Sequence, residues 1–189
     1  MRIISGTARG KRLAVFQGAS IRPTPDKVRG AIFSMLFSRI GSFNGKKILD
    51  LCSGTGAMAI EALSRGAEFA WLVDNGAESA RIIPANLTAC RVEERATFIL
   101  SDAQKALRLL EQHGPFDVIF LDPPYGKALV PALLDGISAG NFLCDDGIVC
   151  AEAAETDEVP QQVGALNRVL SRNYGITTVH IYSHSEPEV

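Results

Sequence analysis

Residues 116–125 have the sequence FDVIFLDPPY, and this stretch decides the fold. Its first six residues are mostly apolar and have the length of a buried parallel strand. Prolines 123 and 124 have no backbone N–H to donate to a sheet, so the strand has to end before them. Ligands of open α/β sheets bind at this carboxyl end. Asp122-Pro123-Pro124-Tyr125 is therefore a candidate site, although a plain strand end with Tyr125 packed in the core has the same sequence.

The rest of the chain alternates between strand and helix patterns. Apolar residues from Val28 to Ile40 recur at helical spacing, and two strands near the end of the chain form a hairpin. Together these patterns predict an α/β fold with a doubly wound, mostly parallel, seven-stranded sheet of Rossmann-like type. The core strands are predicted at 47–51, 69–73, 97–100, 116–121 and 147–151, the hairpin strands at 168–172 and 177–182, and the core helices at 57–65, 77–89, 103–112 and 129–139.

Helix-end signals refine two of these elements. Thr24 is a good N-cap residue, Pro25 suits the first helical position, and Gly41 suits the end of the same helix. Pro84 lies inside the predicted helix 77–89. A proline there costs about 3 kcal/mol unless the helix kinks or breaks, so the path of this helix is left open.

Length and composition limit the kind of protein. The chain has 189 residues, of which 47% are hydrophobic and 21% charged, as in a globular domain with one sizeable core. No run of about 18 apolar residues indicates a membrane span, and no apolar segment near Met1 resembles a secretory signal. The four cysteines lack zinc-ligand spacing, so we expect free thiols, no metal site and a cytoplasmic location.

Charge is distributed unevenly along the chain. The net charge is −2, yet the first 30 residues carry seven basic side chains and one acidic side chain, and the remainder carries a net −8. Residues 1–20 are predicted to form a small basic β-hairpin extension with strands at 3–6 and 13–15, and residues 21–189 the main domain. Such an extension suits a phosphate backbone, although a merely solvated charged segment has the same composition. The cations expected at its tip are Arg9, Lys11 and Arg12.

The first core strand leads into a glycine-rich turn, residues 50–56, with the sequence DLCSGTG. Gly54 and Gly56 allow a tight turn and a close approach of a ligand to the backbone where a helix begins. With Ala59, the spacing also satisfies the loose G-x-G-x-x-G/A pattern of dinucleotide sites. This pattern is weak by itself, and a glycine turn without a ligand is the alternative.

Acidic residues end four successive strands, at Asp50, Asp74, Asp102 and Asp122. An acid at position 74 can accept hydrogen bonds from ribose hydroxyls, and one at position 102 from an adenine amino group. Each of these two is, taken singly, equally well explained as a helix N-cap. Carboxylates gathered at one edge of a sheet repel one another, so a cationic or hydrogen-bond-donating ligand would relieve that cost.

The position of Asp50 distinguishes between two cofactors. NAD would place its pyrophosphate on the glycine turn, close to the Asp50 carboxylate, which is unfavourable. S-adenosylmethionine has an adenine, a ribose diol, a positively charged sulfur and an amino-acid tail, but no phosphate. The four acids therefore suit S-adenosylmethionine better than NAD.

At this point the motifs resemble a known class. Asp50-x-x-x-Gly54-x-Gly56, Asp74, Asp102 and residues 122–125 resemble the class I S-adenosylmethionine-dependent methyltransferases with a D-P-P-Y motif. Two N-terminal segments, IISGTARGKRL (3–13) and RPTPDKVR (22–29), are similar to the RsmD-type family, and the resemblance covers essentially the whole chain. Those enzymes methylate a guanine N2 in bacterial 16S ribosomal RNA. Five residues depart from the family pattern without removing a group that the chemistry needs: Gly30, Cys52, Ser53, Asp74 and Pro84.

The resemblance implies S-adenosylmethionine as cofactor and 16S rRNA, in a small ribosomal subunit or an assembly intermediate, as partner, with no membrane and no metal. Asp122 and the Pro123 carbonyl are expected to accept the two N–H groups of the target amine, with Tyr125 stacked on the extruded base; Pro124 completes the catalytic motif. Arg9, Lys11 and Arg12 are expected to bind RNA phosphates. The expected cofactor-binding residues are Arg22, Thr24, Asp50, Cys52, Ser53, Gly54, Gly56, Asp74, Asn75, Asp102 and Ala103.

Other functions stay open from the sequence. A methyltransferase acting on a DNA adenine N6 or on a protein glutamine could use a similar tetrapeptide, although the chain has no separate target-recognition domain. An NAD-dependent oxidoreductase fits the glycine turn but leaves Asp50 and the Pro-Pro turn unexplained. A non-enzymatic RNA-binding protein fits the basic extension but not the four acids.

Overall fold

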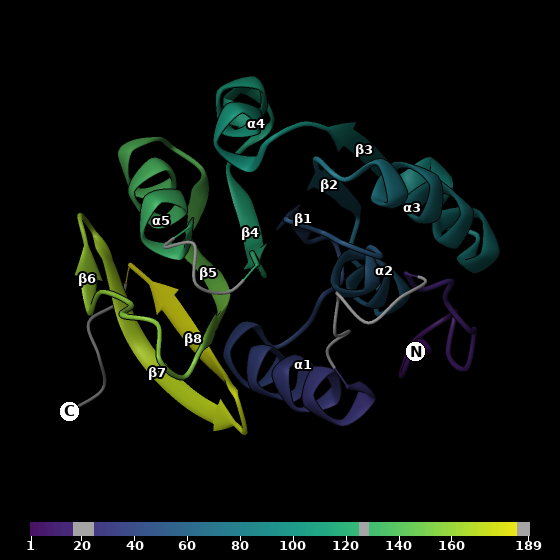
Figure 1. Ribbon diagram of the computed structural model, residues 1–189, viewed down its shortest axis with the longest axis horizontal. Helices are drawn as coiled ribbons and strands as arrows, with labels where there is room; N and C mark the ends of the chain where they lie inside the picture. The colour runs from purple at the N-terminus through teal and green to yellow at the C-terminus, as the bar shows by residue number, and fades with distance from the viewer. Residues whose placement is uncertain (17–24, 125–128, 185–189) are drawn as a thin grey trace.

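The computed structural model describes residues 1–16, 25–124 and 129–184, and within these ranges it contains one eight-stranded sheet with helices on both faces (Figure 1). The strands are β1 (Lys47–Leu51), β2 (Phe69–Asp74), β3 (Ala96–Leu100), β4 (Phe116–Leu121), β5 (Leu143–Ala154), β6 (Gln162–Val163), β7 (Leu166–Tyr174) and β8 (Thr177–Ser183). The α-helices are α1 (Asp26–Ile40), α2 (Ala57–Ser64), α3 (Ala77–Cys90), α4 (Ala103–Leu110) and α5 (Leu129–Ala139), with short 3-10 helices η1 (Glu93–Arg95) and η2 (Glu111–His113).

The strand order in the sheet is β3-β2-β1-β4-β5-β8-β7-β6. The first five strands in this order are mutually parallel, and β8, β7 and β6 continue the sheet in antiparallel pairs. The predicted α/β fold with a doubly wound, mostly parallel sheet is confirmed. The predicted number of seven strands is wrong: β6 adds an eighth, and its two residues are too few to show any periodic pattern.

The helices form two layers, one on each face of the sheet. Helices α1, α2 and α3 pack on one face, where Ile32, Phe33 and Leu36 of α1 join a buried cluster with residues of α2 and α3. Helices α4 and α5 pack on the other face around a second buried cluster. Since both faces are covered, β4 is buried at five of its six residues, as the apolar run predicted. Within the described ranges, no helix has the length and apolar composition needed to span a bilayer.

The helix ends partly follow the sequence signals. Gly41 ends α1 with φ of 70°, and its N–H donates to the Phe37 carbonyl, as predicted. Pro25 occupies the N-cap position instead of the first helical position, because α1 begins at Asp26; Thr24 lies outside the described residues. Helix α3 runs through Pro84 as one helix from Ala77 to Cys90.

The N-terminal segment forms a smaller hairpin than predicted. The N–H of Ile3 donates to the Lys11 carbonyl at 2.9 Å, and the N–H of Gly10 donates to the Ile3 carbonyl at 2.8 Å. Arg2 and Arg12 form a single antiparallel bridge, so the predicted strands at 3–6 and 13–15 are wrong in their extent. The proposed boundary after residue 20 lies outside the described residues.

Candidate functional site

The four strand-end acids lie along one edge of the sheet. Asp50 in β1 is paired with Phe120 of the neighbouring β4, and Asp74 in β2 is paired with Leu100 of the neighbouring β3. Asp122 follows the last residue of β4, and Asp102 lies two residues after the last residue of β3. Because β3, β2, β1 and β4 are adjacent and parallel, all four acids meet at their common carboxyl edge. This gathering is the arrangement that the sequence predicted.

Asp50 is the most deeply buried of these acids, with 1% of its surface exposed. Its Oδ2 accepts a hydrogen bond from the N–H of Ala59 in α2 at 3.1 Å. Burial and, to a smaller extent, the neighbouring carboxylates of Asp122 and Asp74 raise the pKa of Asp50 to about 8, against the lowering effect of the Ala59 hydrogen bond. A positive charge placed beside Asp50 would reverse this effect and favour the carboxylate.

Cys52 lies in the middle of the acids. Its φ of 65° is unusual for a residue other than glycine and belongs to the sharp turn after β1. The pKa of its thiol is raised to about 12, first by burial and then by the four carboxylates. A thiol with such a pKa is not a nucleophile at neutral pH, so Cys52 acts here as a half-buried part of the turn.

The glycine turn is tied to β2 through Ser53 and Asp74. The N–H of Ser53 donates to the Val73 carbonyl at 2.9 Å, and the Ser53 hydroxyl accepts from the Val73 N–H at 3.0 Å. Asp74 Oδ2 accepts from the N–H of Gly54 at 2.8 Å, while its Oδ1 accepts from the N–H of Gly76 at the start of α3 at 2.8 Å. Asp74 thus joins the glycine turn to the start of α3.

Gly56 shows why a glycine is needed in this turn. Its φ is 77°, a left-handed conformation that side chains disfavour, and a Cβ added to it would lie 3.0 Å from Cδ2 of Leu72. The helix α2 begins immediately after it, so the turn brings backbone and helix start close to the acids.

Asp102 acts as a helix cap in the structure. Its Oδ1 accepts from the N–H groups of Gln104 at 3.0 Å and Lys105 at 3.3 Å, which makes it the N-cap of α4. Capping and ligand binding are compatible, because a carboxylate has more acceptor positions than these two bonds occupy. The other cofactor candidates nearby are Asn75, exposed beside Asp74, and Ala103, half-buried at the start of α4.

The segment after β4 begins as the sequence predicted. Asp122 is half-buried, Pro123 is buried, and Pro124 is exposed. Burial raises the pKa of Asp122 to about 6, so most of it is ionised at neutral pH. The predicted residues Tyr125, Arg22 and Thr24 lie outside the described residues.

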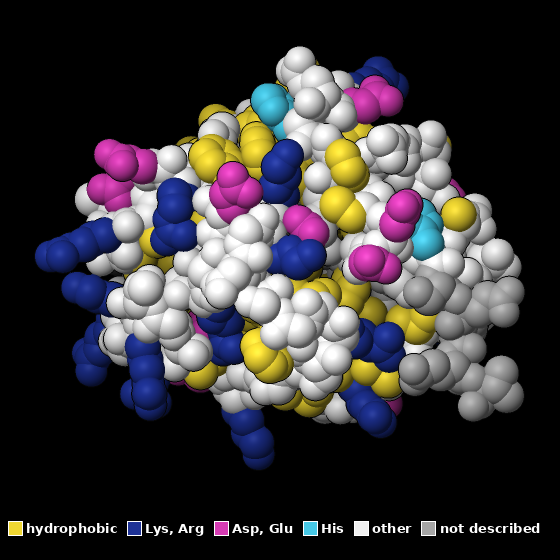
Figure 2. All heavy atoms as spheres, turned by 180° about the vertical axis from the view of Figure 1, so that it is seen from behind, with side chains coloured by type: hydrophobic (Ala, Val, Ile, Leu, Met, Phe, Trp, Pro, Cys, Tyr) yellow, Lys and Arg dark blue, Asp and Glu magenta, His cyan; other side chains and the backbone are white. Residues whose placement is uncertain are grey.

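The three cations of the N-terminal hairpin are exposed, at Arg9, Lys11 and Arg12. Figure 2 views the molecule from behind, so the side of the N-terminus in Figure 1 is at its left; several Lys and Arg side chains project from the lower left of this face. Arg91, at the end of α3, is a further exposed cation, which the sequence analysis did not single out.

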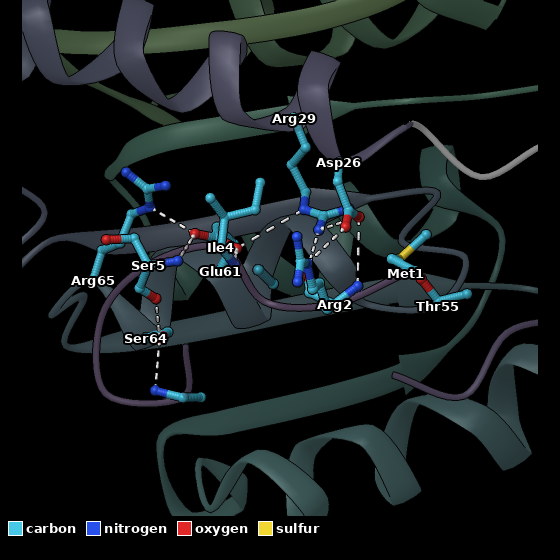
Figure 3. A network of polar contacts seen from close by, with 12 residues as sticks. Met1, Arg2, Ile4, Ser5, Asp26, Arg29, Thr55, Glu61, Ser64 and Arg65 are labelled. Atoms are coloured by element: carbon cyan, nitrogen blue, oxygen red, sulfur yellow. Dashed lines mark hydrogen bonds and ion pairs between the residues drawn. The ribbon is translucent and has the colours of Figure 1, made fainter. Parts of the chain in front are cut away.

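A network of buried charges fastens the hairpin to α2 (Figure 3). Glu61, fully buried in α2, accepts from the N–H groups of Ile4 at 2.7 Å and Ser5 at 3.0 Å. The same carboxylate pairs with Arg65 at 2.8 Å and with the buried Arg29 of α1 at 3.9 Å. The hairpin therefore rests on a buried carboxylate that has two backbone donors and two guanidinium groups around it.

Arg29 and Ser64 complete this attachment. A guanidinium N–H of Arg29 donates to the carbonyl of Arg2, and the same group lies 3.1 Å from Asp26. The Ser64 hydroxyl accepts from the N–H of Ala8 at 2.9 Å and donates to the carbonyl of Ser5 at 2.6 Å. Figure 3 shows these side chains of α1 and α2 meeting around the first residues of the chain.

Comparison with known proteins identifies the family. The model of the family described as "Conserved hypothetical protein 95" matches residues 1–183. The chain belongs to this family. Its relatives include "Putative rRNA methyltransferase YlbH" of Bacillus subtilis, 38% identical over 96% of this chain and 98% of the relative. "Ribosomal RNA small subunit methyltransferase D" of Escherichia coli is 30% identical over 85% of this chain and 78% of the relative.

A solved structure described as "Putative methyltransferase yhhF from Escherichia coli" has the same fold as this family member. Its TM-score is 0.82, with 25% identity over 96% of each chain. These matches confirm the predicted resemblance to the RsmD-type family and the assignment to the rRNA methyltransferases. Within the residues that the structure describes, no group of three or more His, Cys, Asp or Glu side chains is arranged to hold a metal ion.

Two side chains of this family member belong to the site region but were missed from the sequence. Glu152 of β5 is buried, and because Ala151 pairs with Leu121, Glu152 follows at the level of Asp122 and extends the row of acids to a fifth strand. Asn86 of α3 is buried and reaches both the N-terminal segment and the glycine turn. A single Glu in a strand and a single Asn in a helix give no motif, so periodicity could not reveal them.

Proposed function

We propose that this protein transfers a methyl group from S-adenosylmethionine to the exocyclic N2 of a guanine in 16S ribosomal RNA, in the small ribosomal subunit or one of its assembly intermediates in the cytoplasm. The relatives named as rRNA methyltransferases support this substrate class. The observation that carries the proposal is the row of carboxylates beside the Asp122-Pro123 turn, at the carboxyl edge of the sheet. That row is suited to a cationic donor and an amine acceptor.

The residues present fit S-adenosylmethionine better than a dinucleotide. Two N–H groups of the glycine turn already donate within the protein, from Gly54 to Asp74 and from Gly56 to Ser53, so neither is directed at a phosphate. The raised pKa of the buried Asp50 carboxyl indicates that the protein supplies no group to compensate a negative charge there. These features disfavour the NAD alternative, because a pyrophosphate would add negative charge at the same place.

Each part of the cofactor has a proposed binding group in this chain. Asp50 and the turn from Cys52 to Gly56 would hold the amino-acid tail, Asp74 with Asn75 the ribose, and Asp102 with Ala103 the adenine. Arg22 and Thr24 would help to close the site. When bound, the cofactor supplies a methyl group on a positively charged sulfur.

The chemistry of the acceptor explains why Asp122 is needed. The lone pair of an exocyclic amine is delocalised into the ring, so the amine is a poor nucleophile. The Asp122 carboxylate and the Pro123 carbonyl would accept its two N–H groups, which favours pyramidal nitrogen and directs its lone pair. With a pKa of about 6, Asp122 is ionised at neutral pH and is also able to take the proton that the amine loses. Positioning and charge complementarity supply most of the rate.

RNA binding is assigned to the hairpin and to the end of the catalytic motif. Arg9, Lys11 and Arg12 would contact phosphates, and residues 1–20 would form the extension that presents them. Tyr125 would stack on the extruded guanine, next to the exposed Pro124.

Mass spectrometry of ribosomal RNA tests this proposal. Cells that lack the protein should lose one N2-methylguanine from 16S rRNA, and the wild-type gene should restore it. An Asp122→Ala gene should not restore it, although the purified variant should still bind S-adenosylmethionine. Loss of a methyl group from DNA or from a protein glutamine, with unchanged rRNA, would overturn the assignment to RNA.

A further inference from the structure

Residues 11–16 lead from the cations of the hairpin to the glycine turn. Lys11 and Arg12 are exposed at one end of this segment. At the other end the ring of Phe16 lies against the turn, because a Cβ added to Gly54 would come within 3.6 Å of its Cε2. A short stretch of chain therefore joins the proposed RNA contacts to the proposed cofactor contacts.

Asn86 holds this segment to the turn. Its Oδ1 accepts from the N–H of Ala14 at 2.7 Å, and its Nδ2 donates to the Ala14 carbonyl at 3.0 Å. The same Nδ2 donates to the carbonyl of Thr55, in the glycine turn, at 2.9 Å. Asn86 is 1% exposed, so its amide relies on these protein groups as hydrogen-bond partners. One amide thus bridges the N-terminal segment and the turn directly.

The other attachments of the hairpin have a different position. Glu61 binds Ile4 and Ser5, and Ser64 binds Ser5 and Ala8, so both fasten the first residues of the chain to α2. Of the side chains that the structure describes, Asn86 is the one whose hydrogen bonds reach both Ala14 and the glycine turn. The Thr55 hydroxyl also donates to Sδ of Met1, at 3.6 Å, so the first residue of the chain has its own contact with the turn, whereas the described side-chain link between Ala14 and the turn runs through Asn86.

The geometry points to Asn86 as a positioning residue that couples RNA binding on the hairpin to cofactor binding at the glycine turn. This inference rests on the proposed function. Both ligands would favour the arrangement in which Ala14 and Thr55 share the Asn86 amide, so each ligand would tighten the binding of the other by the same factor. Asn86 itself touches neither ligand.

Binding measurements with and without RNA test the coupling. S-adenosylhomocysteine is used as the probe, because it permits equilibrium titration without turnover, and the RNA is 16S rRNA, naked or in small ribosomal subunits. In the wild type, one of these RNA forms should tighten S-adenosylhomocysteine binding at least fivefold. Asn86→Ser and Asn86→Asp lose one or both of the donated hydrogen bonds. In these variants the coupling factor, by which RNA tightens S-adenosylhomocysteine binding, should fall to about one. A factor that is unchanged in both variants overturns the inference.

Ser64→Ala is the matched control. It removes one buried side-chain attachment of the hairpin but leaves the amide bridge between Ala14 and Thr55 in place. It should do no more than weaken RNA binding, and the coupling factor should stay above about fivefold. Loss of coupling in Ser64→Ala, equal to that in the Asn86 variants, would assign the effect to general loosening of the hairpin and overturn the role of Asn86.

Amide hydrogen exchange on the wild type tests the inference without any variant. Adding S-adenosylhomocysteine should slow exchange at least threefold in a peptide covering residues 11–16 as well as in the glycine turn. Slowing confined to the turn would contradict the coupling while leaving the proposed function intact. If S-adenosylhomocysteine and S-adenosylmethionine both failed to bind, the proposed function itself would be overturned, and the inference with it.

Discussion

Asp50 of β1 and Glu61 of α2 are both buried acids, but the groups around their carboxylates differ. Glu61 is enclosed by two backbone N–H groups and by the guanidinium groups of Arg65 and Arg29. Asp50 accepts one N–H, from Ala59, and faces the carboxylates of Asp122 and Asp74. One acid is neutralised by its own chain, whereas the other is surrounded by charge of its own sign.

These different surroundings distinguish a buried charge that stabilises the fold from one that is available to a ligand. A buried charge that is fully paired holds elements together, and removing its partner is costly. A buried charge among like charges costs stability, and a fold keeps it where a ligand supplies the missing partner. The Glu61 network therefore attaches the hairpin, while the row of four acids is, in the proposed function, the place of the cationic cofactor.

Asp122→Asn should show the largest effect on the functional side. The amide keeps the size of the side chain but loses the negative charge and one acceptor oxygen, so methyl transfer should fall about 10³-fold with little change in cofactor affinity. Single-turnover transfer of a labelled methyl group measures the rate. Asp146→Asn, at an exposed acid of β5, is the control and should retain full activity. A loss below tenfold in Asp122→Asn would remove Asp122 from the chemistry.

Glu61→Ala should show the largest effect on the structural side. It removes the carboxylate that pairs with Arg65, leaves the buried Arg29 guanidinium with Asp26 alone, and frees the N–H groups of Ile4 and Ser5, so the free energy of unfolding should fall by about 3 kcal/mol. Urea unfolding measures this change. Glu68→Ala, at an exposed acid four residues beyond α2, should change stability by less than about 0.5 kcal/mol. Equal effects of the two substitutions would contradict the structural role of Glu61.

This contrast also shows how much the sequence could reveal. The row of four acids was predictable, because each acid lies at or within two residues of the end of an apolar strand, and parallel strands bring their carboxyl ends together. The Glu61 network was not predictable, because its partners at Ile4, Ser5 and Arg29 are 57, 56 and 32 residues away in the chain. Spacing rules describe neighbours on one helix or strand, and here just the pair with Arg65 has such spacing.

Some backbone features could likewise be predicted from the sequence, and others could not. The end of α1 at Gly41 was predictable, since a left-handed residue there is a local requirement. The short strand β6 was not, since its two residues are ordered by pairing with β7. The path of α3 through Pro84 also depends on surroundings: Ile83, Asn86 and Leu87 are buried, and this packing outweighs the local cost of the proline.

The raised pKa of Asp50 gives a smaller, pH-dependent effect. Its folded pKa of about 8 lies above its ordinary value, so the free protein keeps this carboxyl protonated at pH 6 and loses stability as pH rises through about 8. A cationic ligand favours the ionised form, so S-adenosylmethionine binding should tighten about tenfold from pH 6 to pH 8, with release of a proton. Calorimetry in buffers of different ionisation enthalpy measures both the affinity and the number of protons released. Asp50→Asn should bind more weakly and lose this pH dependence; an unchanged dependence would assign it to another group.

Lys11→Ala should have the smallest effect, because its charge is exposed and, in the proposed function, pairs with phosphate in water. Affinity for 16S rRNA should fall a few-fold at physiological salt, and the slope of log affinity against log salt should decrease by about one. Filter binding over a range of salt concentrations measures this slope. Lys47→Ala, at a cation on the opposite edge of the sheet from the acids, should leave the slope unchanged. Equal slopes for the wild type and Lys11→Ala would show that Lys11 makes no phosphate contact.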